Sequence, residues 1–133
     1  MKCLIVEDDL SALRLMQRYL ADYAHCDTAM DGEQALTAFR QAVQEKRPYE
    51  LVCLDIMLPR MDGHTVLQAM RQIETECGIN GGAKVIMTTA LRDLSSVSDA
   101  FSEGCEVYLV KPVERGKLLK ELEGLGLIPV KIR

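Results

Sequence analysis

The chain has 133 residues, of which 48% are hydrophobic and 27% charged, and its formal net charge is −4. This length suits one domain with a full apolar core, which excludes a disordered chain. The slightly acidic balance excludes a dedicated nucleic-acid binder, which concentrates basic residues on one surface. No stretch reaches the roughly 18 apolar residues of a membrane span. Acidic residues 7–9 come too early for a signal peptide, so we expect a cytoplasmic protein with no membrane contact.

Five short runs, mostly apolar, follow one another along the chain and predict β-strands at residues 3–6, 25–29, 51–54, 84–88 and 107–110. Four of them are almost continuous in apolar side chains, which is typical of strands covered on both faces. The second run, residues 25–29, is more polar, as expected of an edge strand.

Between these runs, apolar residues recur at helical spacing over residues 10–20, 35–43, 66–73, 94–101 and 118–125. The second stripe follows Asp31, which can cap a helix, with Gln34 three residues later. The repeated alternation predicts a doubly wound α/β fold with a parallel sheet and right-handed crossovers. Residues 76–83 are rich in glycine and predict an extended loop before the fourth strand.

The five cysteines form no CxxC pair and no Cys-His pattern at zinc spacing. They are Cys3, Cys26, Cys53, Cys77 and Cys105. Their number is odd, and three of them fall in the predicted strands or at strand starts. We therefore expect reduced, buried thiols.

The predicted strands end at polar side chains that carry chemistry. In chain order these are Glu7, Asp8, Asp9, Asp55, Thr89 and Lys111. Ligands of parallel sheets bind beyond the carboxyl ends of the strands, so these side chains should converge. Crowded carboxylates favour Mg²⁺, which also accepts phosphate oxygens, and an aspartate can attack phosphorus to form an acyl phosphate. Taken one at a time, these residues are equally compatible with a structural role in a helix cap or a turn. Their joint placement predicts phosphoryl transfer to Asp55 beside Mg²⁺ held at Glu7 and Asp8.

The sequence strongly resembles the receiver domain of two-component response regulators. The matching segments are residues 4–9, 54–59, 61–63, 87–91 and 104–112, in family order. The resemblance covers nearly the whole chain and implies a receiver domain over residues 1–125 with a short C-terminal tail at 126–133. It also implies a flavodoxin-like fold whose five-stranded sheet has the order 2-1-3-4-5.

The resemblance implies a role for each acidic residue of the site. Asp55 resembles the phosphoacceptor and is also one of the metal ligands that the resemblance implies. Asp8 resembles a direct Mg²⁺ ligand, and Glu7 one that acts through water. The main-chain carbonyl of Met57 resembles the last ligand that the protein supplies.

Three residues in or directly after the last two predicted strands resemble the remaining switch residues of the family; they are Thr89, Tyr108 and Lys111. Thr89 matches better than Thr88, because an alanine follows it and Lys111 lies 22 residues later. Tyr108 resembles the switch aromatic, and the peptide bond after Lys111 is usually cis in this family. Two departures flank the site: Met57, where some relatives carry a polar side chain, and Leu91.

The resemblance implies a phosphoacceptor switch that catalyses only its own phosphorylation and dephosphorylation. The donor would be a histidine kinase or a phosphotransfer protein. A downstream protein would bind the face made by the fourth helix, the fifth strand and the fifth helix, roughly residues 93–124. The chain ends about twenty residues after Lys111. We therefore expect either a single-domain, chemotaxis-type regulator or a piece of a longer protein.

Three alternatives remain open from the residues. A degenerate receiver would act only as a protein-interaction scaffold. A phosphohydrolase of the haloacid dehalogenase type needs a second acid two positions after Asp55, where Met57 stands. A flavodoxin-like cofactor binder would need a phosphate loop after the first strand, where residues 7–9 would repel a phosphate.

Overall fold

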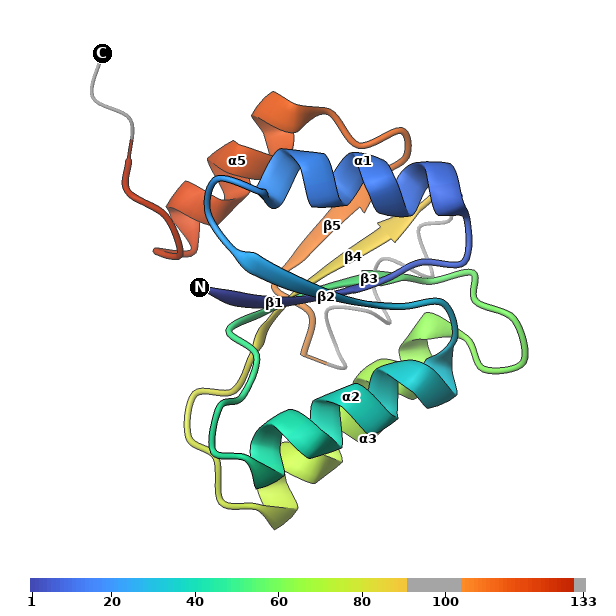
Figure 1. The fold of residues 1–133 in the computed structure, drawn as a ribbon, viewed down its shortest axis with the longest axis vertical. Helices are drawn as coiled ribbons and strands as arrows, with labels where there is room; N and C mark the ends of the chain where they lie inside the picture. The colour runs from blue at the N-terminus through green and yellow to red at the C-terminus, as the bar shows by residue number, and fades with distance from the viewer. Residues whose placement is uncertain (91–103, 131–133) are drawn as a thin grey trace.

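A computed structural model describes residues 1–90 and 104–130 of the chain (Figure 1). Its centre is a five-stranded sheet with the order β2-β1-β3-β4-β5, in which all neighbouring strands are parallel. The strands are β1 (Lys2–Val6), β2 (His25–Ala29), β3 (Leu51–Asp55), β4 (Lys84–Thr89) and β5 (Val107–Val110). The predicted strand order is confirmed, and every predicted strand agrees with the structure to within one residue at each end.

The helices cover both faces of this sheet, as predicted. They are α1 (Leu10–Leu20), α2 (Gly32–Gln44), α3 (Gly63–Glu76) and α5 (Arg115–Gly124). In Figure 1, α1 and α5 lie on one face of the sheet and α2 and α3 on the other. The helix predicted over residues 94–101 lies outside the described residues. Within the part of the chain that the structure describes, no helix is long and apolar enough to cross a membrane.

Two apolar layers explain the continuous hydrophobic runs of the strands. Along β1, Leu4 and Val6 pack with α2 and α3, whereas Cys3 and Ile5 pack with α1 and α5. Successive side chains of a strand point to opposite faces, so a strand covered on both sides needs apolar residues at every position. The edge strand β2 is more exposed, in agreement with its polar sequence.

Aspartates begin three of the helices by accepting main-chain hydrogen bonds. Asp9 accepts from the Ser11 N–H at 3.1 Å, and Asp31 accepts from the Gln34 N–H at 2.8 Å. Asp62 caps α3 in the same way. Such a cap contributes about 1 kcal/mol to stability. All three caps lie beside the carboxyl edge of the sheet, because each of these helices follows a strand.

Gly63 lets the first turn of α3 lie directly against the end of β3. A Cβ atom at this position would stand 2.5 Å from the carbonyl oxygen of Asp55 and 2.8 Å from the Cα of Ile56. Both atoms belong to the main chain and cannot move aside. We therefore expect Gly63→Ala to lower the free energy of unfolding by about 1–3 kcal/mol. Urea denaturation measures the change.

A matched control for this substitution is Gly116→Ala in α5, where a Cβ would meet nothing within 4 Å. Because alanine is the better helix former, this variant should be as stable as the unchanged protein or more stable, by up to about 1 kcal/mol. Equal unfolding midpoints for the two variants would contradict the close contact at Gly63.

A charged network fixes the amino ends of β4 and β5, at the edge of the sheet opposite to the aspartate caps. Glu74 is buried in α3, and its carboxylate accepts from the Ala83 N–H at 2.6 Å. Arg71 donates to Glu74 at 2.8 Å and to the Ala83 carbonyl at 2.8 Å, and it pairs with Glu106. The glycine-rich loop predicted before β4 is present, and this network holds its end.

Candidate functional site

The polar residues predicted at the strand ends do converge at one edge of the sheet. Glu7 and Asp8 follow β1, Asp55 is the last residue of β3, and Lys111 follows β5. One carboxylate oxygen from each of Glu7, Asp8 and Asp55 lies within 4.8 Å of the others. Asp8 is exposed, whereas Glu7 and Asp55 are each only 3% exposed. The cluster therefore has a buried floor and one ligand at its opening.

Both oxygens of the Asp55 carboxylate have partners. The Lys111 Nζ lies 3.0 Å from Asp55 Oδ2, and the Met57 N–H donates to Asp55 Oδ1 at 3.0 Å. Lys111 also forms an ion pair with Glu7 Oε1. These contacts hold the Asp55 carboxylate in one orientation with its neighbours in place. Sequence reasoning brought the residues to the same edge but did not identify the pairing of Lys111 with Glu7.

The crowding of charge appears in two pKa shifts. Burial raises the pKa of Glu7 to about 7; the nearby Asp55 raises it too, whereas hydrogen bonds from Lys111 and from the Asp9 N–H lower it. Burial opposes the charge on Lys111, but its hydrogen bonds to Glu7 and Asp55 outweigh burial and raise its pKa above the usual value. The two buried carboxylates of Glu7 and Asp55 therefore share the ammonium group of Lys111.

This donor set fits a hard divalent cation. Carboxylate oxygens are the ligands that Mg²⁺ prefers, and the ion keeps several water molecules, which an opening at the exposed Asp8 allows. A nearby cation also favours the charged form of a carboxylate whose pKa burial has raised. Glu7, Asp8 and Asp55 are thus the residues that would hold Mg²⁺. Met57, whose main-chain carbonyl was predicted as a further ligand, follows two residues after Asp55.

Thr89 and Tyr108 lie on the same face of the sheet. Thr89 is fully buried and is the last residue of β4. Met87, two residues earlier on the same strand, points to the same face as Thr89 and pairs with Tyr108 of β5. Tyr108 is partly buried against the same apolar layer as Met87. Thr88 is also buried, but it lines a cavity on the α1 side.

The Lys111–Pro112 peptide bond is cis, as the resemblance implied. Leu91 lies outside the described residues.

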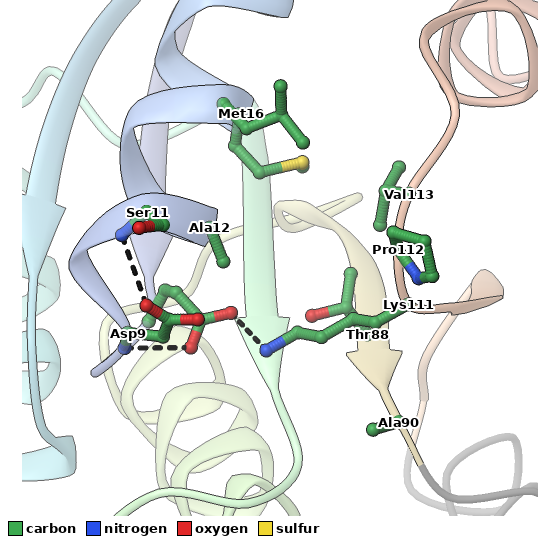
Figure 2. Close-up of a pocket in the computed structure, with 11 residues that line it drawn as sticks. Asp9, Ser11, Ala12, Met16, Thr88, Ala90, Lys111, Pro112 and Val113 are labelled. Carbon is green, nitrogen blue, oxygen red and sulfur yellow. Dashed lines mark hydrogen bonds and ion pairs between the residues drawn. The ribbon is translucent and has the colours of Figure 1, made fainter.

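This cavity, of about 390 Å³, adjoins the site on the side of α1 (Figure 2). Figure 2 shows Ala12 and Met16 of α1 on one wall and Pro112 and Val113 on the other. Glu7, Thr88 and Lys111 also line it. No sequence pattern indicated this cavity, because its width depends on how α1 packs against the segment after β5.

The prediction of five buried thiols is partly wrong. Cys3, Cys53 and Cys105 are buried and all five cysteines are free, but Cys26 is half-buried and Cys77 is exposed. Cys77 follows the last residue of α3, where the chain turns toward solvent. Cys26 lies in the edge strand β2, which in the described part of the chain pairs only with β1.

Comparisons with known proteins agree with this geometry. The chain is 34% identical to a probable transcriptional regulator, ycf27, of Cyanophora paradoxa, over 93% of the chain and 47% of the regulator. The chain thus spans about half the length of such relatives. It is 32% identical to the chemotaxis protein CheY of Listeria monocytogenes, over 90% of the chain and 94% of that protein. It also resembles a chain of the CheX–CheY–BeF3–Mg²⁺ complex from Borrelia burgdorferi, with a TM-score of 0.79, 30% identity, and coverage of 98% of this chain and 90% of that one.

The family described as "Response regulator receiver domain" matches residues 3–123, nearly the entire chain. The match agrees with the strand order and with the segments on which the resemblance was based. The scaffold, phosphohydrolase and flavodoxin-like alternatives receive no support from these comparisons. The chain belongs to the receiver domain family of two-component response regulators, whose members act as phosphoacceptor switches in signalling.

Proposed function

We propose that Asp55 is the phosphoacceptor of this receiver domain and that Glu7, Asp8, Asp55 itself and the Met57 carbonyl hold Mg²⁺. The observation that carries the proposal is the convergence on Asp55: Lys111 Nζ lies 3.0 Å from its Oδ2, and Glu7 and Asp8 complete a carboxylate cluster within 4.8 Å. A carboxylate in such surroundings is oriented by fixed partners, and charge that develops next to it meets a positive side chain.

In the transfer step, a carboxylate oxygen of Asp55 attacks the phosphorus of a phosphohistidine on a kinase or phosphotransfer protein. The new O–P bond forms as the P–N bond breaks, and the imidazole leaves with the electron pair. Lys111 is placed to pair with a phosphoryl oxygen once the Asp55 carboxylate has become an acyl phosphate. Thr89 would donate a hydrogen bond to another oxygen. Bound Mg²⁺ would supply charge neutralisation for the phosphoryl oxygens.

A direct test uses a small acyl phosphate donor with the unchanged protein. With Mg²⁺ present, intact-mass measurement should detect one added phosphoryl group, which base removes because acyl phosphates are labile. Without Mg²⁺ the uptake should be far slower. Since no kinase is present, uptake would also show that the domain catalyses its own phosphorylation. A protein that gains no phosphoryl group at any donor concentration would contradict the proposal.

Met57 sets the lifetime of the acyl phosphate in this proposal. Its side chain is 57% exposed and directly follows the Asp55–Ile56 pair, so it presents an apolar group where an attacking water would be positioned. We expect Met57→Asn to speed hydrolysis several-fold, because the amide can orient a water molecule. Decay of the phosphorylated protein, followed by intact mass, measures the rate. Met30→Asn, a change at another exposed methionine, should leave the rate unaltered. A slower or unaltered decay in Met57→Asn would refute the steric argument.

We further propose that phosphorylation alters the face predicted over residues 93–124, which includes β5 and α5 and to which a downstream protein would bind; residues 93–103 of this face lie outside the described residues. The route would run from Thr89 to Tyr108, which share one side of the sheet. A bistable packing element of this kind converts one local charge into a change of surface.

The receiver domain would comprise residues 1–125, followed by a short tail whose Ile128 packs on the core. We place the protein in the cytoplasm, without nucleic-acid or membrane partners.

Thr89→Ala tests this route. In the unchanged protein, saturation with Mg²⁺ and a phosphoryl mimic should shift the NMR signals of the Tyr108 ring. Thr89→Ala should remove most of that shift even when the mimic fills the site, because the variant lacks the hydroxyl that would move toward the phosphoryl group. Thr88→Ala, a neighbouring change on the opposite face, should keep the shift. A Tyr108 ring unmoved in the unchanged protein at saturation would disprove the route.

A further inference from the structure

Three of the five cysteines lie side by side in neighbouring strands. Cys26 is in β2, Cys3 in β1 and Cys53 in β3, and all three contact the apolar layer under α1 and α5. Cys3 is the central member: it is completely buried, and its strand β1 lies between β2, which carries Cys26, and β3, which carries Cys53. Cys26, at the edge of the sheet, is the half-buried member through which a reagent can enter.

The strand register allows only one of the two neighbouring pairs to form a disulfide. Cys3 and Cys26 are direct partners in the β1–β2 pair. Their Cα atoms are therefore about 4.8 Å apart, inside the range of roughly 4.4–6.8 Å found across disulfides. Cys53 instead pairs with Ile5, two residues beyond Cys3. This offset adds about 6.6 Å along the strand and separates the Cα atoms of Cys3 and Cys53 by roughly 8 Å, which is too far.

Within this row, Cys26 and Cys3 differ in the pKa of their thiols and therefore in reactivity. A hydrogen bond from Cys3 lowers the pKa of the Cys26 thiol, although burial and Asp27 oppose this effect. Hydrogen bonds to Cys26 and Cys53, together with burial, raise the pKa of Cys3 well above its usual value. The thiolate is the nucleophilic form of cysteine. Cys26 is thus the more reactive and the more accessible of the pair, and Cys3 stands next to it as the second thiol.

We propose that Cys26 is an oxidation site for hydroperoxides and that Cys3 resolves it into a reversible Cys3–Cys26 disulfide between β1 and β2. The Cys26 thiolate attacks the peroxide, an S–O bond forms as the O–O bond breaks, and an alcohol or water leaves. Cys3 then loses its proton and attacks the Cys26 sulfur. The S–S bond forms, the S–O bond breaks, and the departing hydroxide takes the proton as water. Both thiols are oxidised and the peroxide is reduced.

This proposal does not depend on the phosphoacceptor proposal. The bridge would join strands whose carboxyl ends are already connected, because the Glu7 N–H donates to the Ala29 carbonyl at 3.0 Å. It would add a covalent link beside β1, four residues before Glu7. A dithiol reductant would restore the free thiols, so the reduced state expected in a cytoplasm is the resting form.

The experiment treats the full, reduced chain with a small excess of hydrogen peroxide, alkylates the remaining thiols after unfolding, and maps the peptides by mass spectrometry. We expect a Cys3–Cys26 disulfide, with Cys53 and Cys105 alkylated, and full recovery of thiols with dithiothreitol. The Cys77→Ser background removes the exposed thiol, so that bridges between molecules do not obscure the result. Oxidation confined to Cys77 in the unchanged chain, with Cys26 still reduced, would overturn the proposal.

Two variants separate the roles of the buried thiols. Cys53→Ala should form the Cys3–Cys26 bridge as the unchanged chain does. Cys3→Ala should instead accumulate sulfenic and sulfinic acid at Cys26, because the thiol that would resolve it is gone. The mapping of the unchanged chain already decides the proposal if Cys3→Ala does not fold. A Cys3–Cys53 bridge, or loss of the Cys3–Cys26 bridge in Cys53→Ala, would contradict the register argument.

Discussion

Asp55→Asn is expected to take up no phosphoryl group from any donor that labels the unchanged protein. The amide oxygen is a poor nucleophile, and the nitrogen cannot form a stable acyl phosphate. The fold should survive, because Lys111 keeps its ion pair with Glu7 and the asparagine oxygen can still accept from the Met57 N–H. Intact mass after incubation with donor and Mg²⁺ measures the loss, which should be complete. Labelling at the level of the unchanged protein would refute the assignment of Asp55.

The matched control for this variant is Asp62→Asn. Asp62 is an exposed aspartate that caps α3 near the same edge, and it accepts from the Thr65 N–H at 2.9 Å. Asparagine caps helices as well as aspartate does, so stability should change little. Asp62→Asn should take up one phosphoryl group at the rate of the unchanged protein. If both variants lost labelling, the effect would come from a general change in charge rather than from the acceptor.

Asp8→Ala should lose most of the response of the protein to Mg²⁺. Binding to the folded state raises the free energy of unfolding as the ion concentration exceeds the dissociation constant. Removal of one carboxylate ligand should weaken Mg²⁺ binding at least about tenfold, or ~1.4 kcal/mol. Without Mg²⁺, the variant should be as stable as the unchanged protein or more stable, because one repulsive charge is gone. Titration calorimetry and melting curves measure the two effects.

Asp9→Ala separates this effect from helix capping. Asp9 caps α1 through the Ser11 N–H, so its loss should cost about 1 kcal/mol of stability. Its carboxylate is not part of the cluster of Glu7, Asp8 and Asp55, so the rise in melting temperature with Mg²⁺ should remain. Equal Mg²⁺ responses in the unchanged protein and Asp8→Ala would exclude Asp8 as a ligand.

The parts of the molecule that local pattern and topology determine were predictable from sequence. A parallel sheet buried on both faces needs continuous apolar strands, and its carboxyl edge collects the residues that follow them. This reasoning located Glu7, Asp8, Asp55 and Lys111 together. The resemblance supplied the strand order and the choice of Thr89 over Thr88, which no periodicity could make.

Contacts between distant side chains were not predictable. Glu74 sits inside an apolar helical stripe, but nothing in the sequence indicates that it pairs with Arg71 and binds the Ala83 N–H. The row of Cys26, Cys3 and Cys53 depends on register, which is fixed by packing of the whole sheet. The exposure of Cys77 depends on where α3 ends relative to solvent. Each of these features requires the three-dimensional arrangement.

The anchored loop before β4 offers a place to attach a reporter to this protein. Glu74 fixes the end of the loop by binding the Ala83 N–H, while a Cβ atom at Gly78 or Gly81 would meet nothing within 4 Å. Lengthening a surface loop costs only about 0.6 kcal/mol for each doubling of its length. A peptide tag inserted between these glycines would lie at the edge of the sheet away from Asp55. The exposed Cys77 offers a dye attachment point at the same edge, so the protein could be labelled without touching the site.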